Sequence, residues 1–183
     1  MARAIAFTGM PGSGKSVAVE VARRLGMPVF RMGDAVWAEV RARGLSLDEA
    51  HVGRVATEMR EAHGPGIWAV RTAERIRKTD SPLVVIDGVR SLAEVEVFRR
   101  ELGPAFTLVA LHASSATRLG RLMGRGRQDD VKSEAEFRGR DERELSWGIG
   151  QAIAVADATL ENEGEVAQLE RDVETLLRRL AAP

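Results

Sequence analysis

The first segment that could do chemistry lies near the start of the chain and reads Gly9-Met10-Pro11-Gly12-Ser13-Gly14-Lys15-Ser16. It follows the apolar run Ala4–Thr8, a predicted buried strand, and opens Ser16–Leu25, a predicted helix. Glycines let backbone N–H groups curl round an anion, and the helix N-terminus points at the same place. Lys15 can reach the β- and γ-phosphates of ATP, and the Ser16 hydroxyl can bind Mg²⁺. The segment therefore predicts a P-loop, with a glycine-rich turn as the alternative.

A second candidate is Asp87, which ends the apolar run Leu83–Ile86 and precedes Gly88. An acidic residue at the carboxyl end of a central strand lies beside a P-loop in such folds, where it holds or orients Mg²⁺. An ordinary turn aspartate is the alternative. Beside the P-loop we favour Ser16 and Asp87 as the metal site, and Lys15 and Asp87 as catalytic residues.

The composition limits the class of protein. The chain has 183 residues, which favours one domain, and its 27 basic residues balance 27 acidic ones. Zero net charge argues against a general nucleic-acid binder, although a local basic patch stays possible. Cysteine is absent, and no apolar run approaches the ~18 residues of a membrane span. We expect a cytoplasmic protein with no membrane partner, for which a nucleic-acid partner is unlikely but not excluded.

The elements that must position these residues alternate along the chain. Three S-x-x-E capping boxes, beginning at Ser46, Ser91 and Ser133, predict helix starts. The predicted strands are Ala4–Thr8, Pro28–Arg31, Leu83–Ile86, Phe106–His112 and Ala158–Glu161. Alternating strands and helices with continuously apolar strands predict an α/β fold, a P-loop three-layer αβα sandwich around a five-stranded parallel sheet.

Together, GMPGSGKS, MGD, VIDGVRS and RGRQDD resemble the nucleoside monophosphate kinases, the adenylate kinase group. Nearly the whole chain is more similar still to an archaeal family of adenylate-kinase-like or dephospho-CoA-kinase-like P-loop proteins. The resemblance implies ATP as phosphoryl donor with Mg²⁺, and a small-molecule nucleotide acceptor. It also implies a helical acceptor-binding insertion at about 34–78 and a short lid at about 124–140.

The acceptor site is implied by two stretches. Gly33-Asp34 resembles the start of the acceptor-binding helix, and Arg90 resembles the arginine that grips the acceptor's phosphate, one residue early for that pattern. Adenylate kinases carry a further arginine where this chain has Trp37. Arg31 or Arg41 could replace it, so Asp34, Arg41 and Arg90 are the expected acceptor residues.

The lid and adenine contacts are also implied by resemblance. Arg127-Gln128-Asp129-Asp130 resembles the closing motif of the adenylate kinase lid, Arg138 follows at the kinase spacing, and Arg121 and Arg125 match the entry arginines. Arg127 and Arg138 are therefore expected to be catalytic, while Arg118 and Arg121 leave open a solvated helix end. Asn162 lies where dephospho-CoA kinases contact adenine, although it also suits an ordinary turn.

The residues support three functions. The first is a nucleotide kinase, and the second is an ATPase-type regulatory or assembly factor acting on RNA or protein, which the missing arginine at Trp37 and the short lid would suit. Dephospho-CoA kinase-like activity belongs with the first, and a nucleotide sensor without turnover is the third. The stretch Ser146–Gly150 suggests no role, and Trp68 and Trp147 are interpreted as packing residues.

Overall fold

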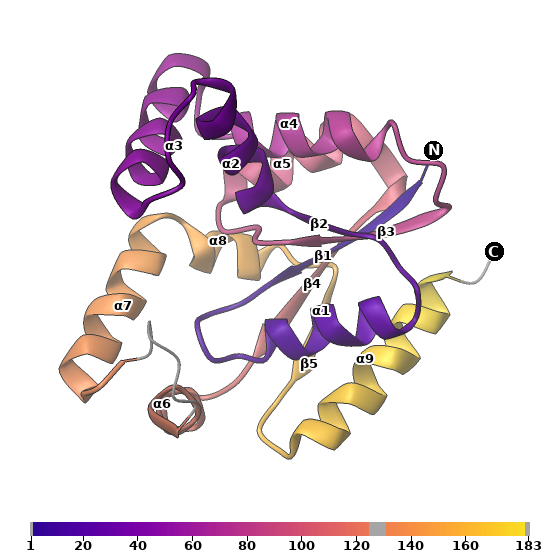
Figure 1. Cartoon of the computed structure of the whole chain (residues 1–183). Coiled ribbons are helices and arrows are strands. Elements are labelled where there is room, and N and C mark those ends of the chain that lie inside the picture. Colours follow the sequence, from indigo (N-terminus) through magenta and orange to yellow (C-terminus); the bar gives the residue numbers. More distant parts are fainter. Residues whose placement is uncertain (1, 125–130, 182–183) are drawn as a thin grey trace.

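The computed structural model describes residues 2–124 and 131–181. Five strands form one parallel sheet in the order β2-β3-β1-β4-β5. The strands are β1 (Arg3–Thr8), β2 (Val29–Arg31), β3 (Leu83–Asp87), β4 (Phe106–His112) and β5 (Ala158–Glu161). The predicted α/β sandwich with a five-stranded parallel sheet is confirmed (Figure 1).

Helices cover both faces of the sheet (Figure 1). Successive strand residues point to opposite faces, so Ile5 and Phe7 pack with α1 (Lys15–Arg24) and α9 (Val166–Ala181). Ala4 and Ala6 face the larger core on the other side. That core is formed with α2 (Met32–Ala42), α3 (Glu49–His63), α4 (Ile67–Ile76), α5 (Leu92–Leu102) and α8 (Ile149–Ala154).

Two further helices lie at the carboxyl edge of the sheet, where the loops after β1 and β3 also emerge (Figure 1). They are α6 (Ser115–Gly124) and α7 (Glu134–Ser146), and they share a small apolar cluster of Leu122, Val131 and Phe137. A short 3₁₀ turn, Gly103–Ala105, precedes β4. The three helices α2, α3 and α4 all fall between β2 and β3 in the chain, in the segment where an acceptor-binding insertion was expected.

The capping boxes have different outcomes. At Ser91 the box is complete, because the Ser91 hydroxyl accepts from the Glu94 N–H and Glu94 reaches back to the Ser91 N–H. The prediction at Ser46 is wrong, because Asp48 caps α3 by accepting from the His51 N–H at 2.8 Å. A carboxylate two residues nearer the helix is an equally good N-cap, so it fixes the later start.

One helix starts earlier than the sequence predicted, and one short helix was missed. Helix α2 begins at Met32 and not at Asp34, so Gly33 lies inside its first turn. Helix α8 was not predicted, because its six residues are too few to show a helical period. Within the described residues, no helix combines the length and the apolar character that a membrane span requires.

Candidate active site

The backbone of the P-loop requires its glycines. Gly9 and Gly14 have φ values of 145° and 107°, in the region that side chains disfavour. A Cβ on Gly9 would lie 2.4 Å from the Leu111 carbonyl oxygen, and one on Gly14 would lie 2.4 Å from Asn162 Nδ2. Among the described residues no side chain caps α1 at Gly14, so the helix directs its first N–H groups at the loop.

The side chain of Asn162 forms a hydrogen bond to the backbone of this loop. Its buried side-chain amide donates to the Ser13 carbonyl at 2.9 Å and accepts from Arg121 Nη2 at 3.2 Å. Arg121 also donates to the Gly164 carbonyl at 3.0 Å, while its Nη1 is buried without a partner among the described residues. Asn162 therefore contacts the P-loop directly, and Arg121 is connected to it through Asn162. The contact of Asn162 with adenine stays a prediction.

Lys15 folds over the same loop. Its ammonium group donates to the Gly9 carbonyl and, at 3.1 Å, to the Met10 carbonyl. Burial, followed by the positive charge of Arg90, lowers the pKa of Lys15 to about 8. A cation held beside a ring of backbone N–H groups, with part of its hydration removed, is suited to a phosphate oxygen.

Ser16 and Asp87 line one cavity of about 450 Å³ beside α1. The register Phe7↔Asp87 places Asp87 at the end of β3, next to the strand from which the P-loop leaves. A hydroxyl and a carboxylate are the hard oxygen donors that Mg²⁺ prefers, so these residues fit the predicted metal. Arg31 forms a weak ion pair with Asp87 at 3.8 Å, and the charge of Asp87 also acts on Lys15.

Arg118 of α6 also contacts the backbone of the P-loop. Its guanidinium is buried, donates to the Pro11 carbonyl at 3.0 Å and forms a two-pronged ion pair with Asp141 of α7 at 2.8 and 2.5 Å. It also lies over the Phe137 ring, 4.9 Å from the centroid. The alternative of a solvated helix end is therefore wrong for Arg118. Its partner Asp141 is 23 residues away in the chain, and no spacing in the sequence could indicate it.

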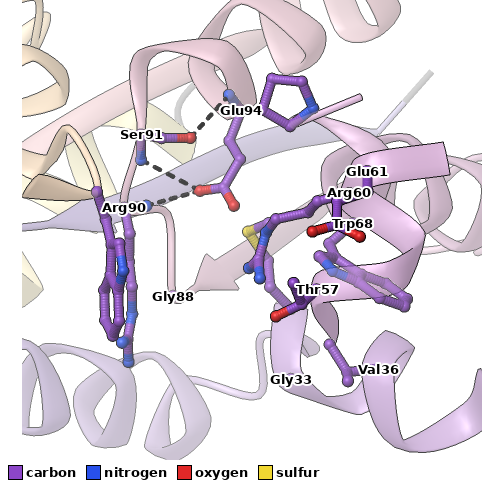
Figure 2. A pocket seen from close by; sticks show the side chains of 13 residues that line it. Gly33, Val36, Thr57, Arg60, Glu61, Trp68, Gly88, Arg90, Ser91 and Glu94 are labelled. Atoms are coloured by element: carbon purple, nitrogen blue, oxygen red, sulfur yellow. Dashed lines mark hydrogen bonds between the residues drawn. The ribbon is translucent and has the colours of Figure 1, made fainter. Parts of the chain in front are cut away.

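A second cavity, of about 490 Å³, opens between α2, α3 and the loop after β3 (Figure 2). Figure 2 shows Arg60 of α3 and Arg90 of the β3–α5 loop on opposite sides of it. Its wall combines apolar, acidic and basic side chains. The lining residues are Met32, Gly33, Val36, Thr57, Arg60, Glu61, Pro65, Trp68, Gly88, Arg90, Ser91, Glu94 and Trp147.

Glu94 faces the cavity from the first turn of α5 (Figure 2). Its carboxylate accepts from the backbone N–H groups of Arg90 at 2.8 Å and Ser91 at 3.2 Å, which fixes the loop that carries Arg90. Burial raises the pKa of Glu94, against the lowering effect of these bonds and of the Arg60 and Arg90 charges.

Three acceptor predictions gain no support from this cavity and stay predictions. Within the part of the chain described, Asp34 and Arg41 do not line it, and Arg31 lies at Asp87 instead. Gly33 and Val36 of α2 line the cavity. Arg60, which was not predicted, faces the cavity from α3.

The predicted lid lies only partly within the described residues. Arg125 and Arg127 lie outside the described residues. Arg138 is exposed on α7 and pairs with Glu134 one turn earlier at 2.5 Å, so a catalytic contact for it stays a prediction. Trp147 was expected to be a packing residue, but half of it is exposed and it lines the second cavity.

The loop, the parallel sheet and the surrounding helices define a P-loop kinase-like α/β domain. A family model described as an AAA domain matches residues 8–138. The chain belongs to the UPF0200 family. It is 46% identical over 173 residues to the UPF0200 protein of Methanosarcina barkeri, covering 94% of this chain and 93% of that protein. It is also 46% identical over 176 residues to that of Hyperthermus butylicus, covering 96% and 94%.

Solved structures share the fold. A gluconokinase from Sinorhizobium meliloti superposes with a TM-score of 0.62 at 20% identity, covering 97% of this chain and 93% of that one. Shikimate kinase from Acinetobacter baumannii gives 0.57 at 17%, covering 98% and 94%. The broader part of the resemblance, a P-loop kinase-like domain with archaeal relatives, is confirmed. The narrower likeness to adenylate or dephospho-CoA kinases stays a prediction.

Proposed function

We propose that the protein transfers the γ-phosphoryl group of Mg-ATP to a small acceptor that itself carries a phosphate, a nucleoside monophosphate or a related nucleotide. One observation carries this proposal. Asp87 lines the cavity of Ser16, and its neighbour Gly88 lines the cavity of Arg60 and Arg90. Two adjacent backbone positions thus bring a donor site and an acceptor site together at the carboxyl end of β3.

The donor half follows from the loop. The N–H groups of the loop and Lys15 hold the β- and γ-phosphates, and Ser16 and Asp87 would hold Mg²⁺. The metal, when bound, neutralises charge on the transferring group. Phosphoryl transfer depends mainly on such positioning and charge neutralisation, which matches a site of cations and backbone N–H groups.

The acceptor half follows from charge and size. A phosphate monoester carries roughly −1.5 to −2 at neutral pH, which two guanidinium groups can match. The two acidic residues of the wall are Glu61 and Glu94, and burial raises the pKa of Glu94. A volume of about 490 Å³ lies in the range of ligand pockets, and Trp68 and Val36 supply apolar wall for the rest of the acceptor.

ADP release tests the proposal. Mg-ATP is offered with each ribonucleoside monophosphate, with dephospho-CoA, and with gluconate and shikimate as acceptors without phosphate. We expect turnover with a phosphorylated nucleotide. Release that needs no acceptor but is stimulated by RNA or protein would support the ATPase alternative. Because Arg60 supplies the second arginine, the residue at Trp37 no longer argues for that alternative.

A further inference from the structure

The stretch Ser146–Gly150, which suggested no chemistry as a sequence, forms the joint between α7 and α8. Helix α7 ends at Ser146, Trp147 is its C-cap, and Gly148 turns the chain with a φ of 95°. A side chain at Gly148 would be strained in that conformation. The turn leaves Trp147 half exposed at the wall of the acceptor cavity.

Trp147 of this joint and Glu144 in the last turn of α7 both contact Arg90. Arg90 Nη1 donates to Glu144 Oε1 at 3.3 Å, and the Arg90 guanidinium carbon lies 5.9 Å from the centroid of the Trp147 ring. Glu144 and Trp147 are three residues apart, so they project from one side of the helix end. The Glu144 carboxylate fixes one N–H of the guanidinium, and the Trp147 ring lies against the guanidinium plane.

Burial shows which partner is fixed. The Glu144 side chain is 9% exposed and that of Arg90 is 53% exposed. A buried carboxylate needs a cation, so Glu144 holds the guanidinium at one edge while the remainder faces the cavity. Both groups also lie within electrostatic range of Lys15, because the charge of Arg90 lowers its pKa and that of Glu144 raises it.

We propose that Glu144 and Trp147 are positioning residues for Arg90, which they hold in the orientation that receives the acceptor's phosphate beside the P-loop. The inference rests on the proposed function. An arginine held in advance loses less side-chain freedom on binding, so the contribution appears in acceptor affinity. The contribution to ATP binding is small, because neither side chain lines the cavity of Ser16 and Asp87.

Steady-state kinetics test the positioning at saturating Mg-ATP. Glu144→Gln should raise the acceptor KM about tenfold, because a charged hydrogen bond becomes a neutral one. At pH 7, where Lys15 is mostly charged, the KM for ATP should change less than twofold. Trp147→Leu should raise the acceptor KM about threefold, and Trp147→Phe should restore it. Glu142→Gln on the exposed side of the same helix is the matched control, and it should match the wild type.

A double-mutant cycle shows whether Glu144 acts through Arg90. Glu144→Gln should cost almost nothing further in a protein that already carries Arg90→Ala. An unchanged acceptor KM in Glu144→Gln, or equal losses with and without Arg90, would overturn the inference. Because Glu144→Gln keeps the size and shape of the buried side chain and the Arg90 side chain is half exposed, circular dichroism should show the wild-type fold.

Tryptophan emission separates this inference from the proposed function. The contribution of Trp147 is the difference between each protein and its Trp147→Phe counterpart. Glu144→Gln should shift that contribution, and the shift should vanish when Arg90→Ala is also present. If no acceptor is turned over, the proposed function fails, and emission alone decides the positioning. No shift in Glu144→Gln would overturn it, and a shift that requires Arg90 would support it.

Discussion

The protonation of Lys15 gives a prediction that needs no knowledge of the acceptor. Burial, with help from the Arg90 charge, lowers the pKa of Lys15 to about 8. Phosphate oxygens at the loop favour the charged lysine and raise this pKa again. ATP binding should therefore take up a proton wherever the pH exceeds the pKa of Lys15 before binding.

The size of the effect follows from that pKa. At pH 8.5 about a quarter of the molecules carry a charged Lys15 if the pKa is about 8, so binding should take up about 0.75 proton. At pH 7.0 the uptake should fall to about 0.1 proton. Nucleotide phosphates are already fully ionised at pH 8.5, because their last pKa lies near 6, and they contribute nothing to the change.

Isothermal titration calorimetry measures the uptake as the dependence of binding enthalpy on the ionisation enthalpy of the buffer. Between pH 7 and pH 9 the ATP affinity should also fall about tenfold, because only the charged form binds well. Lys15→Arg is the control, since its side chain stays charged throughout this range and should show no uptake. Arg90→Ala should reduce the uptake, because removing its charge raises the pKa of Lys15.

The reasoning is refuted if the binding enthalpy at pH 8.5 is the same in buffers of different ionisation enthalpy. An ATP affinity that stays constant from pH 7 to pH 9.5 would contradict it equally. The lowered pKa of Lys15 also makes the free energy of unfolding depend on pH. A lysine with a lowered pKa destabilises the native state at low pH, and this cost disappears as the pH rises from about 8 toward the unfolded value of 10.5.

Two further predictions concern the P-loop and the ion pair packed against it. Asp141→Asn leaves Arg118 buried without its countercharge, so we expect a loss of about 3 kcal/mol in the free energy of unfolding and weaker ATP binding, by urea titration and calorimetry. An unchanged urea midpoint would show that the pair contributes nothing. Gly14→Ala should abolish ATP binding, because the new Cβ meets Asn162 in a strained conformation. Gly26→Ala is the matched control, since Gly26 also has positive φ but nothing lies within 4 Å, and it should bind ATP normally.

The central strands could be predicted because their residues are mostly apolar. Leu83–Ile86 and most of Phe106–His112 needed no tertiary information, since burial on both faces favours apolar residues along the strand. Local chemistry also located Asp87. Helix starts were less reliable where two capping residues lie close together. Serine and aspartate are both favoured N-caps, and Asp48 caps α3 in place of Ser46.

The second cavity could not be predicted, because its residues meet only in the folded chain. Arg60 lies in an amphipathic helix, where its spacing resembles that of a solvated residue. Glu144 has an ordinary position in an acidic helix, and only its burial against Arg90 distinguishes it. Resemblance proposed Asp34 and Arg41, and within the described residues neither side chain lines this cavity.

The measurement that tests the central claim most directly is acceptor-dependent ADP release in Arg60→Ala compared with Arg54→Ala. Arg54 is a matched arginine on the same helix, exposed and outside the cavity wall, with a weak pair to Glu58 at 3.8 Å. We expect Arg60→Ala to raise the acceptor KM at least tenfold, by losing a charged hydrogen bond, and Arg54→Ala to leave it unchanged. Equal kinetics for the two variants, or no turnover by the wild type with any phosphorylated nucleotide, would contradict the account.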